Sequence, residues 1–96
     1  MVYEIILSPE AVEDLKALSA RTRAEVRDGI EKPLRHSPTK TTKSRIKRLR
    51  GVSRPEFRLR VGDVRVFYDV AGRTVQILAI VDKTEASAWL KRIGGE

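Results

Sequence analysis

The sequence contains no cysteine and a single histidine, His36, among its 96 residues. Without cysteine there is no disulfide framework, no thiolate zinc site and no cysteine nucleophile. One histidine is too few to build a metal site, so we expect neither a metal nor a small-molecule cofactor. The sequence also has no apolar run long enough to cross a bilayer and no signal-peptide pattern, so we expect a cytoplasmic protein without a membrane partner.

Acidic residues are also few compared with basic ones. The chain has 13 acidic residues against 20 Lys and Arg, which gives a formal net charge of +7. A chain of this size buries one core at most, so we expect a single domain over residues 1–96 with an open groove rather than an enclosed cavity. A basic excess of this size favours an acidic partner, and nucleic acid is the first candidate.

The amino-terminal half reads as one strand followed by two helices. Residues 2–7 form an apolar, β-branched run that predicts a well-buried strand. Ser8 then caps a helix that we expect to end near Ala20. A second helix is predicted over residues 22–36, antiparallel to the first, with a kink or an early stop near Lys32 because Pro33 removes a helical hydrogen bond. Residues 37–44 are predicted to form the longest loop.

The carboxyl-terminal half predicts a three-stranded meander and a helix. Residues 57–61 and 64–70 alternate apolar and polar positions around Gly62-Asp63, which suits a two-residue hairpin turn. Residues 75–81 are almost entirely apolar and predict the central strand. A last helix, capped by Asp82 or Thr84, would present Ala86, Trp89, Leu90 and Ile93 to the core. The predicted class is α+β in the order βααβββα, with a small, mostly antiparallel sheet packed on an N-terminal helical hairpin and a C-terminal helix.

The hairpin gathers positive charge on one face of the sheet. Its register would pair Arg60 with Arg65 and Arg58 with Phe67, opposite a core face that carries Phe57. Between Lys40 and Arg65 there are ten basic and two acidic residues, whereas the first 19 residues carry a net charge of −3. Like charges on neighbouring strands repel, so this face predicts a polyanion site, although a basic run is also compatible with an ordinary solvated surface.

Arginine suits a polyanion site because its planar fork binds phosphate and can stack on a base. Phe67 lies among the arginines and could stack on a splayed base, but the alternative is an aromatic packed under a helix. Trp89 is interpreted as a core anchor, and His36 is left out of the site because it ends a helix far along the chain from the hairpin. The residues predicted to bind the nucleic acid are Lys43, Arg45, Lys47, Arg48, Arg50, Arg54 and Phe67.

Several short motifs resemble the RelE/ParE superfamily of type II toxin–antitoxin toxins. They are Arg48-Leu49-Arg50-Gly51, the run from Phe57 to Val70, and Ile80-Val81-Asp82-Lys83, and the likeness extends over nearly the whole chain. The resemblance implies a RelE-like cytoplasmic toxin that enters the ribosome, cleaves mRNA without a metal, and is silenced by a cognate acidic antitoxin. It also leaves open a ParE-like DNA gyrase inhibitor, or a catalytically degenerate toxin that only binds its antitoxin.

The resemblance assigns the paired basic positions of the second family strand to Arg58 and Arg60, and the arginine of the third to Arg65. Members of the RelE family commonly carry a further arginine and then an aromatic or histidine near the final helix, and residues 83–90 have no obvious counterpart. Arginine is a poor general base because it keeps its proton. Lys83 is therefore the first candidate for proton transfer and Glu85 the second, with Lys47 and Glu56 as further substitutes.

Overall fold

The structure of the protein is a computed structural model that describes residues 2–51 and 54–95. Within these ranges, five strands, three α-helices and a closing π-helical turn follow one another. Their bounds are β1 (Glu4–Leu7), α1 (Pro9–Ala17), α2 (Ala20–His36), β2 (Ile46–Arg48), β3 (Phe57–Val61), β4 (Val64–Ala71), β5 (Thr74–Asp82), α3 (Ala86–Leu90) and η1 (Lys91–Gly95).

The strands form one mixed sheet in the order β1-β5-β4-β3-β2, in which β1 runs parallel to β5 and the other pairs are antiparallel. The α+β class is confirmed. Strand β2 was not predicted, because three residues with a single buried side chain, Ile46, carry no readable periodicity. The predicted centre of the sheet is wrong by one strand, since the middle strand is β4 and β5 lies between β1 and β4.

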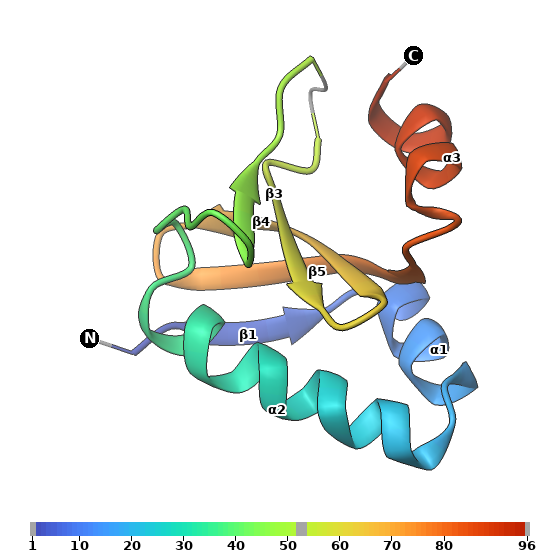
Figure 1. The fold of residues 1–96 in the computed structure, drawn as a ribbon. Helices are drawn as coiled ribbons and strands as arrows, with labels where there is room; N and C mark the ends of the chain where they lie inside the picture. Colours follow the sequence, from blue (N-terminus) through green and yellow to red (C-terminus); the bar gives the residue numbers. More distant parts are fainter. Residues whose placement is uncertain (1, 52–53, 96) are drawn as a thin grey trace.

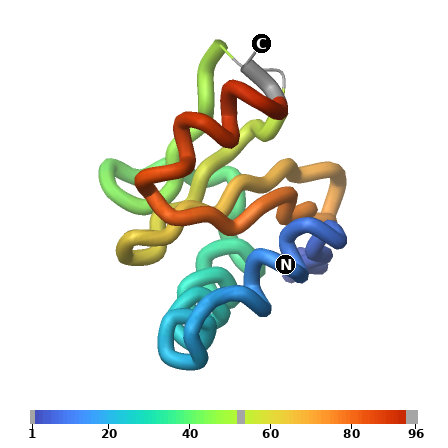
Figure 2. The backbone as a smooth tube through the Cα atoms, turned by 90° about the vertical axis from the view of Figure 1, so that its right-hand side faces the viewer, coloured from blue at the N-terminus to red at the C-terminus, as the bar shows by residue number. Residues whose placement is uncertain are grey.

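Helices cover both faces of the sheet, and Figure 1 shows α1 and α2 on one side and α3 on the other. The larger core lies under α1 and α2 and includes Phe57, Leu59 and Tyr68. A smaller core of Phe67, Ala79 and Trp89 lies under α3. The side view in Figure 2 separates the same layers, with the strands between the α2 segment and the C-terminal segment.

The first helix begins as its sequence predicts. The Ser8 hydroxyl oxygen accepts a hydrogen bond from the amide of Ala11 at 3.0 Å, and Pro9 occupies the first turn, where its missing N–H is not needed. The same hydroxyl donates to the carbonyl of Leu78 in β5, and the amide of Ile80 donates to the Asp14 carboxylate. Burial raises the pKa of Asp14, and the bond from Ile80 partly offsets that rise. These contacts join α1 to β5 beyond the end of β1.

A kink or an early stop was predicted near Lys32, and the early stop is wrong, because α2 continues through Pro33 to His36. Ile30 and Leu34, on either side of the proline, are both buried in the core, and this packing holds the last turn in helical form. An earlier position of α2 makes a close approach to the sheet. A Cβ atom added at Gly29 would lie 2.8 Å from Val61 Cγ1, so the glycine lets α2 pack directly against the end of β3.

Two further expectations are corrected. The strand over residues 2–7 was expected to be well buried, but β1 is an edge strand with a partner on one side only, and Ile6 is 44% exposed. The N-cap position of α3 is occupied by Glu85, whose side chain makes no capping hydrogen bond, rather than by Asp82 or Thr84. The Asp82 carboxylate instead accepts hydrogen bonds from the amide and hydroxyl of Thr84. No helix in the described ranges is long and apolar enough to span a membrane.

Candidate nucleic-acid interface

Strand pairing brings the predicted arginines together on the face of the sheet away from α1 and α2. Arg60 pairs with Arg65 and Arg58 pairs with Phe67, as the sequence register predicts. Gly62 has a φ of 58°, which is the left-handed conformation that the first position of this hairpin turn requires. On the other side of β3, Lys47 pairs with Arg58. We call the group Arg58, Arg60, Arg65 and Lys47 the cationic face.

Arg58 is the most constrained member of the cationic face. Its side chain is half-buried, and its Nε atom is buried without a hydrogen-bond partner. Burial lowers the pKa of Arg58, and the positive charges of Arg65 and Arg60 lower it further. A guanidinium with a desolvated donor and two cationic neighbours is destabilising in the isolated protein. An anion bound here would relieve both effects, so the arrangement favours a ligand that carries phosphate.

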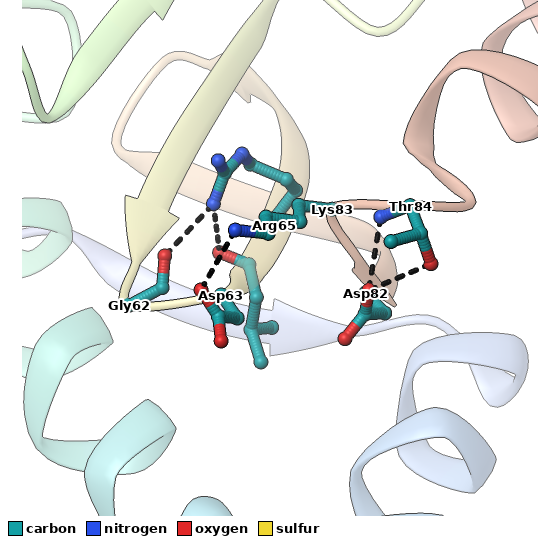
Figure 3. A network of polar contacts seen from close by, with 7 residues as sticks. Gly62, Asp63, Arg65, Asp82, Lys83 and Thr84 are labelled. Atoms are coloured by element: carbon teal, nitrogen blue, oxygen red, sulfur yellow. Dashed lines mark hydrogen bonds and ion pairs between the residues drawn. The ribbon is translucent and has the colours of Figure 1, made fainter.

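Arg65 extends over the hairpin turn that precedes it. Its Nη1 atom donates to the carbonyl of Gly62 at 2.9 Å and to the carbonyl of Val64 at 3.2 Å (Figure 3). Both bonds use the same nitrogen of the guanidinium. They orient the side chain without neutralising its charge, because carbonyl oxygens carry only a partial charge.

Lys83 and Glu85 lie where β5 passes into α3. The Lys83 ammonium is 3.3 Å from the Asp63 carboxylate, and the Lys83 amide donates to the Asp63 carbonyl at 2.8 Å. Figure 3 shows this pair next to Arg65, so Lys83 is held beside the cationic face. Glu85 is exposed at the start of α3, and its side chain makes no capping hydrogen bond. Of the two candidates for proton transfer, Lys83 therefore has the defined position.

The structure places Phe67 in the smaller core, which corrects its assignment as a base-stacking residue. The ring is 0% exposed and stacks on Trp89 with centroids 4.8 Å apart and an interplanar angle of 10°. Phe67 does share a face with Arg58, but α3 covers that part of the face. Trp89 is 3% exposed, as expected of a core anchor, and its indole N–H donates to the Glu10 carboxylate at 2.9 Å.

The predicted RNA-binding residues before β3 divide into two groups. The exposed cations without a described ion pair are Lys43, Arg45, Lys47 and Arg50. Arg48 and Arg54 instead contact the protein itself. The guanidinium of Arg48 lies 5.2 Å from the centroid of the Phe57 ring, and Arg54 Nε donates to the Asp69 carboxylate at 2.8 Å.

Glu56 is engaged in a hydrogen bond within the fold, and His36 lies far from the cationic face. The Glu56 carboxylate accepts a hydrogen bond from the amide of Val70 at 3.2 Å. Glu56, which was considered as a possible general base, therefore has a structural role. His36 is the last residue of α2, which packs on the opposite face from Arg58. Within residues 2–51 and 54–95, no three histidine, cysteine, aspartate or glutamate side chains gather as a metal site would require.

A family model described as the ParE toxin of the type II toxin–antitoxin system parDE matches residues 5–86. The chain belongs to this family. The match to the ParE toxin family covers β2 to β5, both N-terminal helices and all of β1 except Glu4, and so includes the whole cationic face. A search of curated proteins finds no significant match to this ParE-family chain.

Solved structures with this ParE-family fold include RelE systems. One chain of the RelBE2 toxin–antitoxin complex from Mycobacterium tuberculosis superposes with a TM-score of 0.69 and 26% identity, over 85% of this chain and 99% of that one. One chain of the RelB–RelE complex from Methanococcus jannaschii superposes with a TM-score of 0.64 and 21% identity, over 88% of this chain and 96% of that one. A mutant of Escherichia coli RelE in the free state superposes with a TM-score of 0.56 and 16% identity, over 97% of this chain and 99% of that one. The chain is thus a RelE-like member of the RelE/ParE superfamily of type II toxins.

Proposed function

We propose that this toxin is a ribosome-dependent mRNA endoribonuclease that works in the cytoplasm without a metal and inhibits translation. The observation that carries the proposal is the position of Arg58, whose buried Nε has no partner and whose cationic neighbours are Arg60 and Arg65. A fold gains no stability from this arrangement, whereas a bound phosphate would satisfy the donor and offset the repulsion.

The chemistry we propose is attack by the ribose 2′-hydroxyl on the adjacent phosphate. A base takes the hydroxyl proton, the new P–O bond closes a 2′,3′-cyclic phosphate, and the bond to the 5′-oxygen breaks as that oxygen gains a proton. Arg58, Arg60 and Arg65 would stabilise the extra negative charge of the phosphorane, which is the largest contribution a site of fixed cations can make. Lys83 is the first candidate for the proton transfers and Glu85 the second.

Message cleavage in a purified translation reaction tests the proposal. The toxin should cut ribosome-bound mRNA in a mixture whose free magnesium is buffered to the minimum that ribosomes need, and it should still generate cyclic-phosphate ends after it has been dialysed against EDTA. The Arg58→Met and Arg65→Ala proteins serve as matched inactive variants. Intact message with wild-type toxin, under conditions where a RelE toxin cleaves, would refute the nuclease.

The partner we propose is an acidic antitoxin. The structures from M. tuberculosis and M. jannaschii are toxin–antitoxin complexes, and a net charge of +7 on this chain favours a segment of opposite charge. Such a segment would be amphipathic and disordered before it binds. Co-expression with the neighbouring small open reading frame should restore growth and yield a complex on co-purification. Failure of both would refute the antitoxin assignment.

Inhibition of DNA gyrase is the second candidate function. It is favoured by the matching family description, which names a ParE toxin, and by residues 83–90, which lack the arginine and aromatic common in RelE proteins. A gyrase inhibitor needs no acid–base group. Blocked supercoiling by purified gyrase together with intact message would establish this function in place of the nuclease. Intact message and unaffected gyrase would leave a degenerate toxin that only binds its antitoxin.

A further inference from the structure

A second cluster of cations lies around an open cleft where β3 extends beyond β2. The cleft has a volume of about 380 Å³, and its floor and walls come from α2, the segment before β2, and the end of β3. Among the residues that the structure describes, its charged lining consists of Lys32, Arg45 and Arg60, with Asp28 as the one carboxylate. The ion pairs found within the described ranges involve none of these four side chains.

Helix packing explains why these residues meet. Gly29 lies against Val61 so closely that a Cβ would approach Val61 Cγ1 to 2.8 Å. This contact places the next turn of α2, with Lys32, beside the last residues of β3. The amide of Arg60 donates to the carbonyl of Arg45 at 2.8 Å, so the segment before β2 is fixed to the same point. Lys32 is thus brought to Arg60 by a contact between distant parts of the chain.

The cleft continues the cationic face rather than standing apart from it. Arg60 belongs to both, because it pairs with Arg65 in the hairpin and lines the cleft with Lys32. Neighbouring strands lie about 4.8 Å apart, so the path from Arg65 through Arg60 to Arg45 covers about 10 Å. With a spacing of about 3.4 Å per nucleotide in a stacked strand, this distance corresponds to roughly three nucleotides.

We propose that the cleft is a second phosphate-binding subsite, in which Lys32 and Arg45 hold the RNA backbone about three nucleotides from the bond that is cut, with Arg60 between the two positions. The inference rests on the proposed nuclease function, since it extends the same RNA path. It adds Lys32, a residue of α2, to the RNA-binding surface. The role of the subsite is to fix the register of the strand, because phosphate contacts position a nucleic acid without reading its sequence.

An RNA is a better occupant than an acidic protein segment because the cleft carries a carboxylate of its own. Asp28 would repel each side chain of an acidic peptide that reached it, whereas an RNA backbone presents one charge per nucleotide and ribose hydroxyls that donate hydrogen bonds to a carboxylate. The row of exposed guanidiniums also matches the fork geometry that arginine uses with phosphate.

The test compares Lys32→Gln with Arg27→Gln, a matched loss of one charge from an exposed residue of α2 that does not line the cleft. The probe is a fluorescent single-stranded 12-nucleotide RNA, with binding measured by anisotropy at several salt concentrations. Lys32→Gln should weaken binding roughly three- to tenfold and reduce the slope of log affinity against log salt by about 0.7, while Arg27→Gln leaves both unchanged. A dinucleotide is too short to reach the cleft, so its affinity should be the same for all three proteins.

If Lys32→Gln and Arg27→Gln bind the 12-nucleotide RNA with the same slope of log affinity against log salt, the subsite is overturned. The subsite is also overturned if Lys32→Gln weakens the dinucleotide as much as the longer RNA, because the effect would then be general electrostatics. Loss of polyglutamate binding with unchanged RNA binding would assign the cleft to a protein partner instead. These outcomes are separate from message cleavage, so the subsite and the nuclease can fail independently. Thermal melting of both variants checks that α2 is intact.

Discussion

Phe67 and Trp89 stack with their ring centroids 4.8 Å apart and their planes within 10° of parallel. This contact fixes α3 on the face of the sheet that also carries Arg58. Because the same helix buries Phe67, the exposed part of that face is left to side chains that carry charge. The stack therefore sets the boundary between the smaller core and the cationic face.

The stack predicts that Trp89→Ala destabilises the fold by about 3 kcal/mol, the usual cost of removing a large buried aromatic side chain. Trp89→Phe keeps an aromatic partner for Phe67 but loses the bond to Glu10, and should cost about 1 kcal/mol. Urea unfolding followed by far-ultraviolet circular dichroism measures both. A loss below about 1 kcal/mol for Trp89→Ala would show that α3 contributes little to stability, and the burial of Phe67 would then need another explanation.

Arg58 should show the opposite behaviour, with stability gained as function is lost. Arg58→Met keeps an unbranched side chain of similar size and removes a buried donor and a like-charge contact, so the free energy of unfolding should rise by about 1 kcal/mol. The gain should shrink in high salt, which screens the repulsion from Arg60 and Arg65. Arg60→Met is the control, because it relieves part of the same repulsion but removes no buried donor, so its gain in stability should be smaller. Destabilisation by Arg58→Met would mean that the guanidinium has a structural role.

Arg65→Ala should abolish growth arrest while the protein stays folded. The substitution loses two bonds to carbonyls of its own hairpin, which contribute about 1 kcal/mol, but it removes a charge from the proposed phosphate site. Growth after induced expression gives the activity, and a melting curve gives the fold. Arg73→Ala, in the β4–β5 turn, and His36→Ala should both leave growth arrest intact. If His36→Ala is as inactive as Arg65→Ala, the site extends to the far face of the sheet.

Local patterns explain which parts of this fold can be predicted from the sequence. The β3–β4 register follows from the alternation around Gly62-Asp63, and it is confirmed in full because a two-residue turn leaves only one alignment. The Ser8 cap is equally local. The parallel pairing of β1 with β5 joins residues about 70 positions apart, and no local pattern reports it.

The candidate site divides in the same way. Alternation correctly put Arg58 and Phe67 on one face, but it contains no information about the path of α3, which covers Phe67 and leaves the arginines exposed or half-buried. The pairing of Lys47 with Arg58 was missed because β2 is only three residues long. No pattern in the sequence predicts that Lys32 lies beside Arg60, since this position depends on how closely α2 approaches β3.

That approach gives the last prediction. Alanine in place of glycine normally stabilises a helix by roughly 0.5–1 kcal/mol, yet Gly29→Ala should destabilise this protein by about 1–2 kcal/mol. The added methyl would lie 2.8 Å from Val61 Cγ1 and 2.9 Å from Cγ2, so α2 must move away from β3. Val61→Ala removes both of those atoms, and the Gly29→Ala/Val61→Ala double variant should be no less stable than Val61→Ala alone. A double-mutant cycle by urea unfolding gives the coupling.

The same double-mutant cycle tests whether the contact between Gly29 and Val61 also affects RNA binding. If Gly29 acts by placing Lys32 beside Arg60, Gly29→Ala should also reduce the salt dependence of binding to the 12-nucleotide RNA, and the double variant should recover it. A cycle with no coupling would mean that α2 tolerates the methyl group without moving. In that case the close contact with Val61 does not position Lys32, and the cleft would owe its shape to the anchoring of Ile30 and Leu34 in the core.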